Sequence, residues 1–434
     1  MILRRFAPLL AALLPAAPAQ AEAPADQSWA VHGQATLVVQ GVGGFTSPYL
    51  GGNSLEPRQT KETLDLTAYL GVRPWQGAEL WANGEIDQGF GLSDTLGVAG
   101  FPSAEAYKVG KARPYAKLHR LFLRQTIALG GAPLRLDPTA NQLGLTTTTD
   151  RLVLTLGKFG VGDVFDTNRL AHDPRGDFLN WALVDTGSFD YAANAWGYSY
   201  GAAAEWYRGA WTLRAGAFTL SRIPNGVQLD TGLAQNELVA ELEHRHQIGG
   251  RPGALRLTAF RNHGRFARLD EALAAAGTTP PDPVPLRRMM DRAGLAFNAE
   301  QDVTGALSLF VRAGTTDGRI ESYDFTDIDR TLALGGALAG KGWRRPQDRL
   351  GLAVVNNAIS ATRQRFLAAG GLGVLVGDGA LPHPGDERIV EAYYAWQPAA
   401  NASVTLDLQH VTNPGYNRDR GPATILGVRL HAGF

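Results

Sequence analysis

The C-terminal segment of the chain alternates strictly between apolar residues and small or polar ones. One set of alternate positions carries Leu426, Val428, Leu430, Ala432 and Phe434. The positions between them carry Gly427, Arg429, His431 and Gly433. Successive side chains of a strand point to opposite faces, so residues 423–434 are predicted to form a β-strand with one apolar and one polar face.

A hairpin over residues 196–218 repeats this pattern on two strands, with its turn predicted at Arg208 and Gly209. Its apolar face carries Trp196, Tyr198, Tyr200, Ala202, Ala204 and Trp206, and then Trp211, Leu213, Ala215 and Ala217. Its polar face carries Glu205, Thr212 and Arg214. Ten tilted strand residues project to roughly 25 Å, the separation of the aromatic girdles of a membrane barrel. Trp196 and Trp206 are therefore predicted to lie at opposite membrane interfaces.

Three further hairpins keep their charges on one face. Their apolar faces carry Leu238, Ala240, Leu242, Leu255, Leu257 and Ala259; Leu295, Phe297, Ala299, Leu307, Leu309 and Val311; and Val390, Ala392, Tyr394, Trp396, Val404, Leu406 and Leu408. Their opposite faces carry Glu237, Glu241, Glu243, Arg245, Arg256, Thr258, Asn298, Glu300, Arg312, Asp407 and Gln409. An arginine facing lipid at mid-bilayer costs about 2–4 kcal/mol, so these charges are predicted to face an aqueous lumen. The predicted fold is an all-β, transmembrane antiparallel β-barrel. A soluble β-sandwich or β-helix shares the period of two but needs no aromatic girdles.

Both ends of the chain indicate export to the bacterial outer membrane. Residues 1–21 carry Arg4 and Arg5, an apolar stretch and small residues before Ala21, as a signal peptide cleaved after Ala21 does. No later apolar run approaches the roughly 18 residues of a spanning helix. A last strand that closes on Phe434 resembles the signal read by the barrel-insertion machinery. No linker divides the remainder, so residues 22–434 are predicted to form a single barrel domain.

The composition excludes several classes of function. Forty-one basic residues balance 41 acidic ones, which argues against a nucleic-acid partner recruited by net charge. The chain has no cysteine, so it offers neither disulfides nor thiolate ligands. His244 and His246 share a strand face but lack a third ligand. We therefore expect no cofactor and no metal site.

One connection departs from the hairpin rhythm. Residues 163–181 mix Asp, Asn, Arg and His with Phe and Trp, and no regular strand follows until about residue 195. A connection of some thirty residues inside a compact barrel usually has a functional role. We predict that it folds into the lumen and narrows it.

Five segments together resemble the carbohydrate-selective outer-membrane porin family. They are residues 85–91, 97–102, 165–169, 172–181 and 417–422. The resemblance spans nearly the whole mature chain. It implies a barrel of about sixteen strands whose constriction passes monosaccharides such as glucose, or related polyols, by facilitated diffusion.

The candidate constriction residues combine aromatic and hydrogen-bonding side chains. A sugar presents C–H faces and hydroxyl groups, so aromatic surfaces and charged or amide groups both suit it. Phe178 and Trp181 are the predicted stacking surfaces. The predicted polar residues are Arg169, His172, Asp173, Arg175, Asp177 and Asn180 from the long connection, Glu85 and Asp87 as a second group, and Arg120, Arg124, Arg214 and Arg312 as a basic wall opposite the acids. Contacts must be weak, because a tight site would stop flux.

Two catalytic motifs are chance matches. Residues 197–201 fit a nucleophile elbow, but Ser199 lies in a predicted strand without the helix that the motif needs. Residues 335–341 fit a phosphate loop until Gly342 replaces the required Ser or Thr.

Two alternative functions stay open at this point. One is a general or organic-acid-selective porin that uses the arginines, and the other is an outer-membrane lipid-modifying enzyme. The expected partners are sugar solutes, outer-membrane lipid and the insertion machinery. A homo-oligomer stays open as well, because a lipid face and a subunit interface are both apolar.

Overall fold

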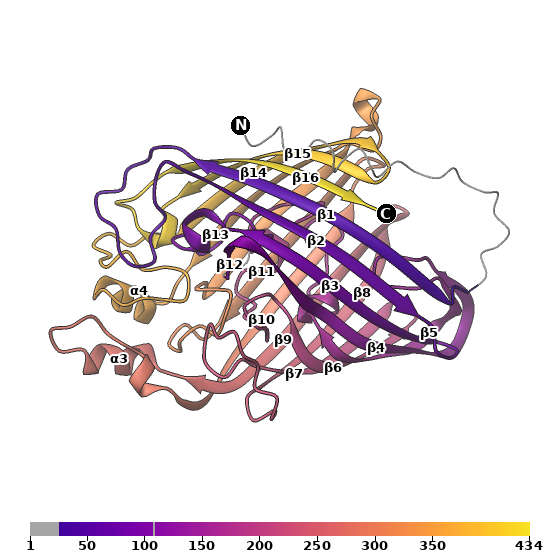
Figure 1. Ribbon diagram of the computed structural model, residues 1–434, viewed down its shortest axis with the longest axis horizontal. Helices are drawn as coiled ribbons and strands as arrows, with labels where there is room; N and C mark the ends of the chain where they lie inside the picture. Colours follow the sequence, from indigo (N-terminus) through magenta and orange to yellow (C-terminus); the bar gives the residue numbers. More distant parts are fainter. Residues whose placement is uncertain (1–25, 107–108) are drawn as a thin grey trace.

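The strands of the protein close into one antiparallel barrel (Figure 1). The computed structural model describes residues 26–106 and 109–434, in which it has sixteen strands. Each strand pairs with its neighbour in sequence, and β16 pairs with β1 in a register that places Leu430 opposite Leu37. The sequence-based prediction of an all-β barrel with about sixteen strands is confirmed. The predicted signal peptide, residues 1–21, lies outside the described residues.

The strands are 9 to 26 residues long. They are β1 (Trp29–Val42), β2 (Gln59–Val72), β3 (Ala78–Gly89), β4 (Lys111–Leu136), β5 (Leu145–Phe159), β6 (Ser199–Arg208), β7 (Trp211–Thr219), β8 (Asn236–Ile248), β9 (Arg251–Phe266), β10 (Arg288–Asp302), β11 (Leu307–Thr316), β12 (Arg330–Ala339), β13 (Arg349–Ala358), β14 (Glu387–Ala399), β15 (Ala402–Thr412) and β16 (Ala423–Gly433).

The helices are short and lie in the connections. They are the α-helices α2 (Trp181–Val184), α3 (Leu269–Ala275) and α4 (Ala361–Ala368), and the 3₁₀ turns η1 (Leu92–Thr95), η2 (Val161–Asp163), η3 (Val284–Leu286), η4 (Gly340–Trp343) and η5 (Pro414–Tyr416). No helix among the described residues combines the length and the apolar character needed to cross a bilayer.

The two ends of the barrel differ in the length of their connections. Connections after odd-numbered strands are long, and the longest joins β5 to β6. Connections after even-numbered strands are mostly short turns, such as the one between β6 and β7. Helices α3 and α4 lie together at the end with the long connections (Figure 1). In outer-membrane barrels the long loops face the exterior and the short turns face the periplasm.

The two faces of each strand have opposite chemistry. On β9, Leu255 and Leu257 are exposed on the outer face, whereas Arg256 and Thr258 are buried on the inner face. The register places Leu257 beside Leu242 of β8 and Phe297 of β10, which makes a continuous apolar belt. The inward charges of the predicted hairpins follow the same rule on β8, β10, β11 and β15. An apolar exterior and a polar interior are what a barrel in a membrane requires.

The prediction that Trp196 and Tyr198 lie on the outer, apolar face of the barrel is wrong. Strand β6 begins only at Ser199, and Trp196 and Tyr198 are buried, while Tyr200 and Trp206 are exposed on the outer face as predicted. The amides of Trp196 and Tyr198 donate to Oδ1 of Asn194, at 3.0 and 3.3 Å. This turn directs both rings inward before the strand starts. In the sequence the alternation already begins before Ser199, the first residue of β6, so it could not reveal the turn.

A charge at the centre of the outer belt is expected to destabilise the barrel. Leu257→Arg should lower the free energy of unfolding in lipid by about 2–4 kcal/mol, because the charge would face hydrocarbon. Ile248→Arg, at the exposed end of β8, is the matched control and should cost about 0–1 kcal/mol. Reversible unfolding in urea from lipid vesicles measures both values. Equal costs at the two positions would contradict the assigned membrane belt.

Candidate functional site

The connection between β5 and β6 lies inside the barrel, as predicted. Backbone amides of the connection donate to inward carboxylates on three strands: Asp166 N to Glu241 on β8 at 2.7 Å, Arg169 N to Glu300 on β10 at 2.6 Å, and Leu179 N to Glu391 on β14 at 2.6 Å. On the opposite wall, Arg175 reaches Asp65 on β2. Contacts to walls on all sides require the segment to cross the lumen. The carboxylates satisfy backbone donors that would otherwise be buried without partners.

Asn180 is a structural residue of this connection. Its side chain caps α2 by accepting from Ala182 N at 3.0 Å, and it donates to Gly100 O at 2.7 Å and to Gln409 at 3.0 Å. Asparagine at such a position satisfies an otherwise unpaired amide of the first helical turn. Asn180 therefore joins the connection to the neighbouring loop and to β15.

The two predicted stacking residues have different positions. Phe178 is completely buried between Phe310 and Tyr393, with ring centroids 5.7 and 4.9 Å away, so it anchors the connection and offers no face to a solute. Its prediction as a stacking surface is wrong, because the connection uses Phe178 to pack against the wall. Trp181 stacks on Phe101 at 5.2 Å and lines a cavity.

This cavity, which we call the constriction site, lies between the β3–β4 loop, β4 and the β5–β6 connection. Its volume is about 170 Å³. Ligand pockets for drug-sized molecules start at roughly 300 Å³, so the site suits a smaller solute. The lining includes Phe101, Glu105, Arg120, Asp163, His172, Arg175, Trp181, Tyr191, Trp196, Tyr198 and Phe325.

The charges of the constriction site are paired. Arg120 makes a bidentate ion pair with Asp163, with Nε–Oδ2 at 2.8 Å and Nη2–Oδ1 at 2.6 Å. Burial favours the neutral acid, but the Arg120 guanidinium holds the pKa of Asp163 below its usual range. Arg175 contacts Glu105 at 2.9 Å, and Asp65 and Glu85 at 3.2 Å each. The site therefore has strong donors and acceptors but little net charge.

His172 faces acceptors with both ring nitrogens. Nε2 lies 3.0 Å from Gly162 O, and Nδ1 lies 3.3 Å from Val184 O and 3.5 Å from Asp185 Oδ1. Burial opposes its positive charge, but the hydrogen bond and charge of Asp185 raise the pKa of His172 to about 9. A protonated ring can donate from both nitrogens, which fits this environment.

The other predicted residues do not line the constriction site. Arg169 pairs with Glu300 and Asp302 and lines a separate cavity of about 560 Å³ together with Arg245 and Arg256. Glu85 and Asp87 lie buried on β3, in the barrel wall. The other five predicted residues make local pairs. They are Asp177 with Arg349, Arg124 with Glu79 and Asn141, Asp173 with the amide of Arg175, Arg214 with Glu205, Glu241 and Glu243, and Arg312 with Asp166 and the carbonyl of Leu183. Arg120, Arg124, Arg214 and Arg312 thus form no continuous basic wall.

Sequence reasoning missed several lining residues. Glu105 follows the family-like segment 97–102 by only three residues, and Asp163 is the first residue of the long connection 163–181. Both residues are therefore adjacent to segments that the sequence already marks as functional. The alternation of the sequence places Trp196 and Tyr198 on the outer face, and no local sequence feature distinguishes Tyr191 or Phe325. These residues come together only through the loop fold.

The charged form of His172 is expected to hold the β5–β6 connection in place. Its pKa is raised from 6.5 to about 9, so this stabilisation is fully present below pH 6.5 and is lost as the pH rises through 9. At pH 7, His172→Gln should speed hydrogen exchange of residues 160–198 on the order of tenfold relative to the wild type. At pH 10 this difference should vanish. The β8–β9 hairpin is the internal control, and a difference that persists at pH 10 would contradict the charged assignment.

Comparisons with known proteins agree with this architecture. No curated protein sequence matches the chain significantly. The high-pH structure of Pseudomonas putida OprB is 16% identical, with 94% of each chain covered and a TM-score of 0.69. The low-pH structure of the same protein is 13% identical, with 94% of this chain and 93% of that chain covered and a TM-score of 0.51. The model of the carbohydrate-selective porin, OprB family, matches residues 55–434. This protein therefore belongs to the OprB family of carbohydrate-selective outer-membrane porins.

Proposed function

We propose that the protein passes monosaccharides, or polyols of similar size, by facilitated diffusion, and that the constriction site selects them. The observation that carries this proposal is the lining of that site, where paired ions alternate with aromatic rings in a small cavity. We further propose that residues 1–21 are the export signal and residues 22–434 the single barrel domain. Passage of a solute requires no covalent step.

The polar groups of the site suit hydroxyl groups. The guanidinium N–H groups of Arg120 and Arg175 can donate to a hydroxyl oxygen, and Glu105 and Asp163 can accept from an O–H. A sugar entering the site would exchange water for these groups, as an ion does in a selectivity filter. Trp181 and Trp196 contribute aromatic surface for its C–H groups.

The pairing also explains why binding should be weak. Nε and Nη2 of Arg120 already donate to Asp163, and Arg175 already contacts three carboxylates. A solute hydroxyl would therefore add a further hydrogen bond to guanidinium and carboxylate groups that are already paired with each other. It would meet no charge that lacks an opposite charge nearby. A site of this kind favours release, which flux requires.

The same pairing disfavours the organic-acid alternative. An anion-selective path needs cationic groups that lack nearby acids, because Coulomb attraction over a few ångströms decides the sign of the field. Arg120, Arg175 and Arg214 each lie within 3.2 Å of at least one carboxylate. An anion gains no net attraction where positive and negative groups are balanced, whereas a neutral solute does not need such attraction.

Liposome swelling tests the proposed selectivity. Vesicles containing the refolded protein should admit glucose faster than an amino acid or a small organic acid of similar size, and a disaccharide should enter slowest. Arg120→Gln should reduce the preference for glucose by about 2- to 10-fold, the value of one hydrogen bond. Arg261→Gln, an exposed outer-face arginine paired with Asp291, should leave it unchanged.

Two results would overturn the proposal. Entry ordered by size alone, with no effect of Arg120→Gln, would reduce the protein to a general diffusion pore. Faster entry of the organic acid than of glucose would favour the anion path.

A further inference from the structure

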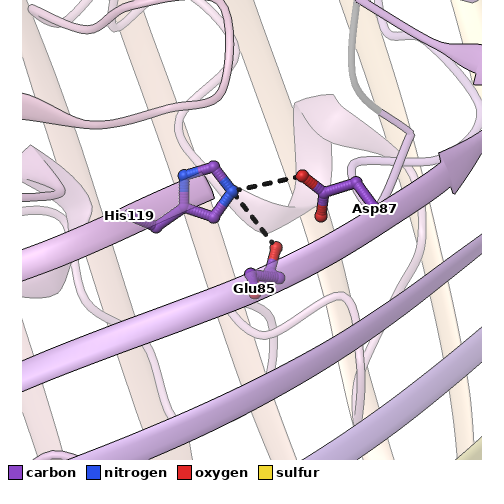
Figure 2. Close-up of side chains that lie close together, drawn as sticks. All are labelled: Glu85, Asp87 and His119. Atoms are coloured by element: carbon purple, nitrogen blue, oxygen red, sulfur yellow. Dashed lines mark hydrogen bonds and ion pairs between the residues drawn. The ribbon is translucent and has the colours of Figure 1, made fainter. Parts of the chain in front are cut away.

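A histidine and two carboxylates converge in the barrel wall beside the constriction site (Figure 2). Glu85 and Asp87 extend inward from β3, and His119 extends inward from the adjacent β4. One ligand atom from each residue lies within 4.8 Å of the other two. All three side chains are buried.

A β-bulge brings His119 into this cluster. The register places Asn83 opposite Arg120 and Gly84 opposite Leu118, so His119 is the extra residue of β4. A bulge redirects the side chain of its extra residue and is frequent next to functional sites. Tyr198 then fixes the orientation of the ring by stacking on it, with 4.5 Å between centroids.

The two distances from the histidine nitrogen fit shared ligation of a metal better than they fit hydrogen bonds. His119 Nε2 lies 3.5 Å from Glu85 Oε1 and 3.4 Å from Asp87 Oδ2. Good N–H···O bonds are about 2.7–3.2 Å long. By contrast, ligands about 2.05 Å from a tetrahedral Zn²⁺ lie roughly 3.3 Å apart. An octahedral ion at about 2.1 Å would set its neighbouring ligands closer, at roughly 3.0 Å.

Neighbouring groups orient Glu85 toward the histidine. Its Oε2 accepts from Thr67 Oγ1 at 2.5 Å and from Arg175 Nη2 at 3.2 Å. These contacts direct Oε1 toward Nε2, as outer-shell partners do for metal-binding carboxylates.

Asp87 gives a second indication of a ligand. The residue is only 1% exposed, and its Oδ1 has no hydrogen-bond partner among the described residues. Its other oxygen, Oδ2, is the one directed at His119. A buried carboxylate that also lies beside a second one, Glu85, is costly unless a cation or a proton neutralises the pair.

We propose that Glu85, Asp87 and His119 bind one divalent transition-metal ion, best matched by Zn²⁺. One nitrogen and two carboxylate oxygens suit Zn²⁺, and the fourth tetrahedral position is left for water. Ca²⁺ needs six to eight oxygen ligands, which this cluster does not supply. The bound ion would hold Glu85, and through it Arg175, at one edge of the constriction site. The proposal does not depend on which solute passes the pore.

Zinc titration of the metal-free protein tests the site. The refolded mature chain in detergent micelles, titrated with ZnCl₂ at pH 7.5, should bind one equivalent, and X-ray absorption should place one nitrogen and about three oxygen ligands near 2.0–2.1 Å. Asp87→Asn and His119→Gln should each weaken binding by about 100-fold or more, because each loses a direct ligand. Mobility on unheated gels verifies that each variant has refolded.

His263, which is partly exposed, and Asp291, which is exposed, form a pair on the outer face that supplies matched controls. His263 contacts Asp291 at 2.6 Å, so His263→Gln and Asp291→Asn make the same chemical changes elsewhere. Both controls should retain the wild-type stoichiometry and affinity. No saturable binding by the wild type would overturn the proposal and leave a shared proton as the neutralising group. Binding lost in the control variants, or unchanged in both Asp87→Asn and His119→Gln, would also overturn it. A failure of one cluster variant to refold leaves the other decisive.

Discussion

The pairing of β16 with β1 is the constraint on which the rest of the molecule depends. In hydrocarbon every backbone amide and carbonyl must be satisfied within the protein, and only a closed sheet does this with strands. Closure fixes an inner and an outer face for each strand, so apolar residues collect outside and charges collect inside. A sixteen-stranded barrel is also too wide for its side chains to fill. The long β5–β6 connection occupies this space, and its own amides then need partners. Inward carboxylates such as Glu241, Glu300 and Glu391 provide them.

The carboxylates that satisfy the backbone amides of the connection also determine the charge of the lumen. Glu241 and Glu300, which hold the connection, add negative charge to the lumen, and Arg169, Arg214 and Arg256 balance it. The constriction site has the same balance of charge in separate ion pairs, Arg120 with Asp163 and Arg175 with Glu105, and aromatic rings line the same cavity. Such a site is polar without a strong net field. It suits a neutral, hydroxyl-rich solute that must bind weakly and leave quickly.

The fold could be predicted from local pattern, whereas the site could be predicted only in part. Alternation such as that of Leu255, Arg256 and Leu257 reports directly which way each side chain points, because a strand has a period of two. The loops have no such rule. Phe178 and Trp181 are three residues apart, yet Phe178 is buried against Tyr393 and Trp181 lines the cavity. Glu105 reaches the site through the β3–β4 loop, and the bulge that redirects His119 leaves no mark in the sequence. Tertiary contacts, which no single segment encodes, decide these positions.

Single-channel recording in planar bilayers tests the central claim most directly, since it detects occupancy of the pore by a solute. With the wild-type protein, added glucose should reduce the open-channel current in a saturable way, with half the effect at roughly millimolar or higher concentration, because contacts to groups that are already paired are weak. A sugar alcohol of similar size should act in the same way, and a small carboxylic acid should act less. A current that glucose leaves unchanged while the carboxylic acid reduces it would contradict the account.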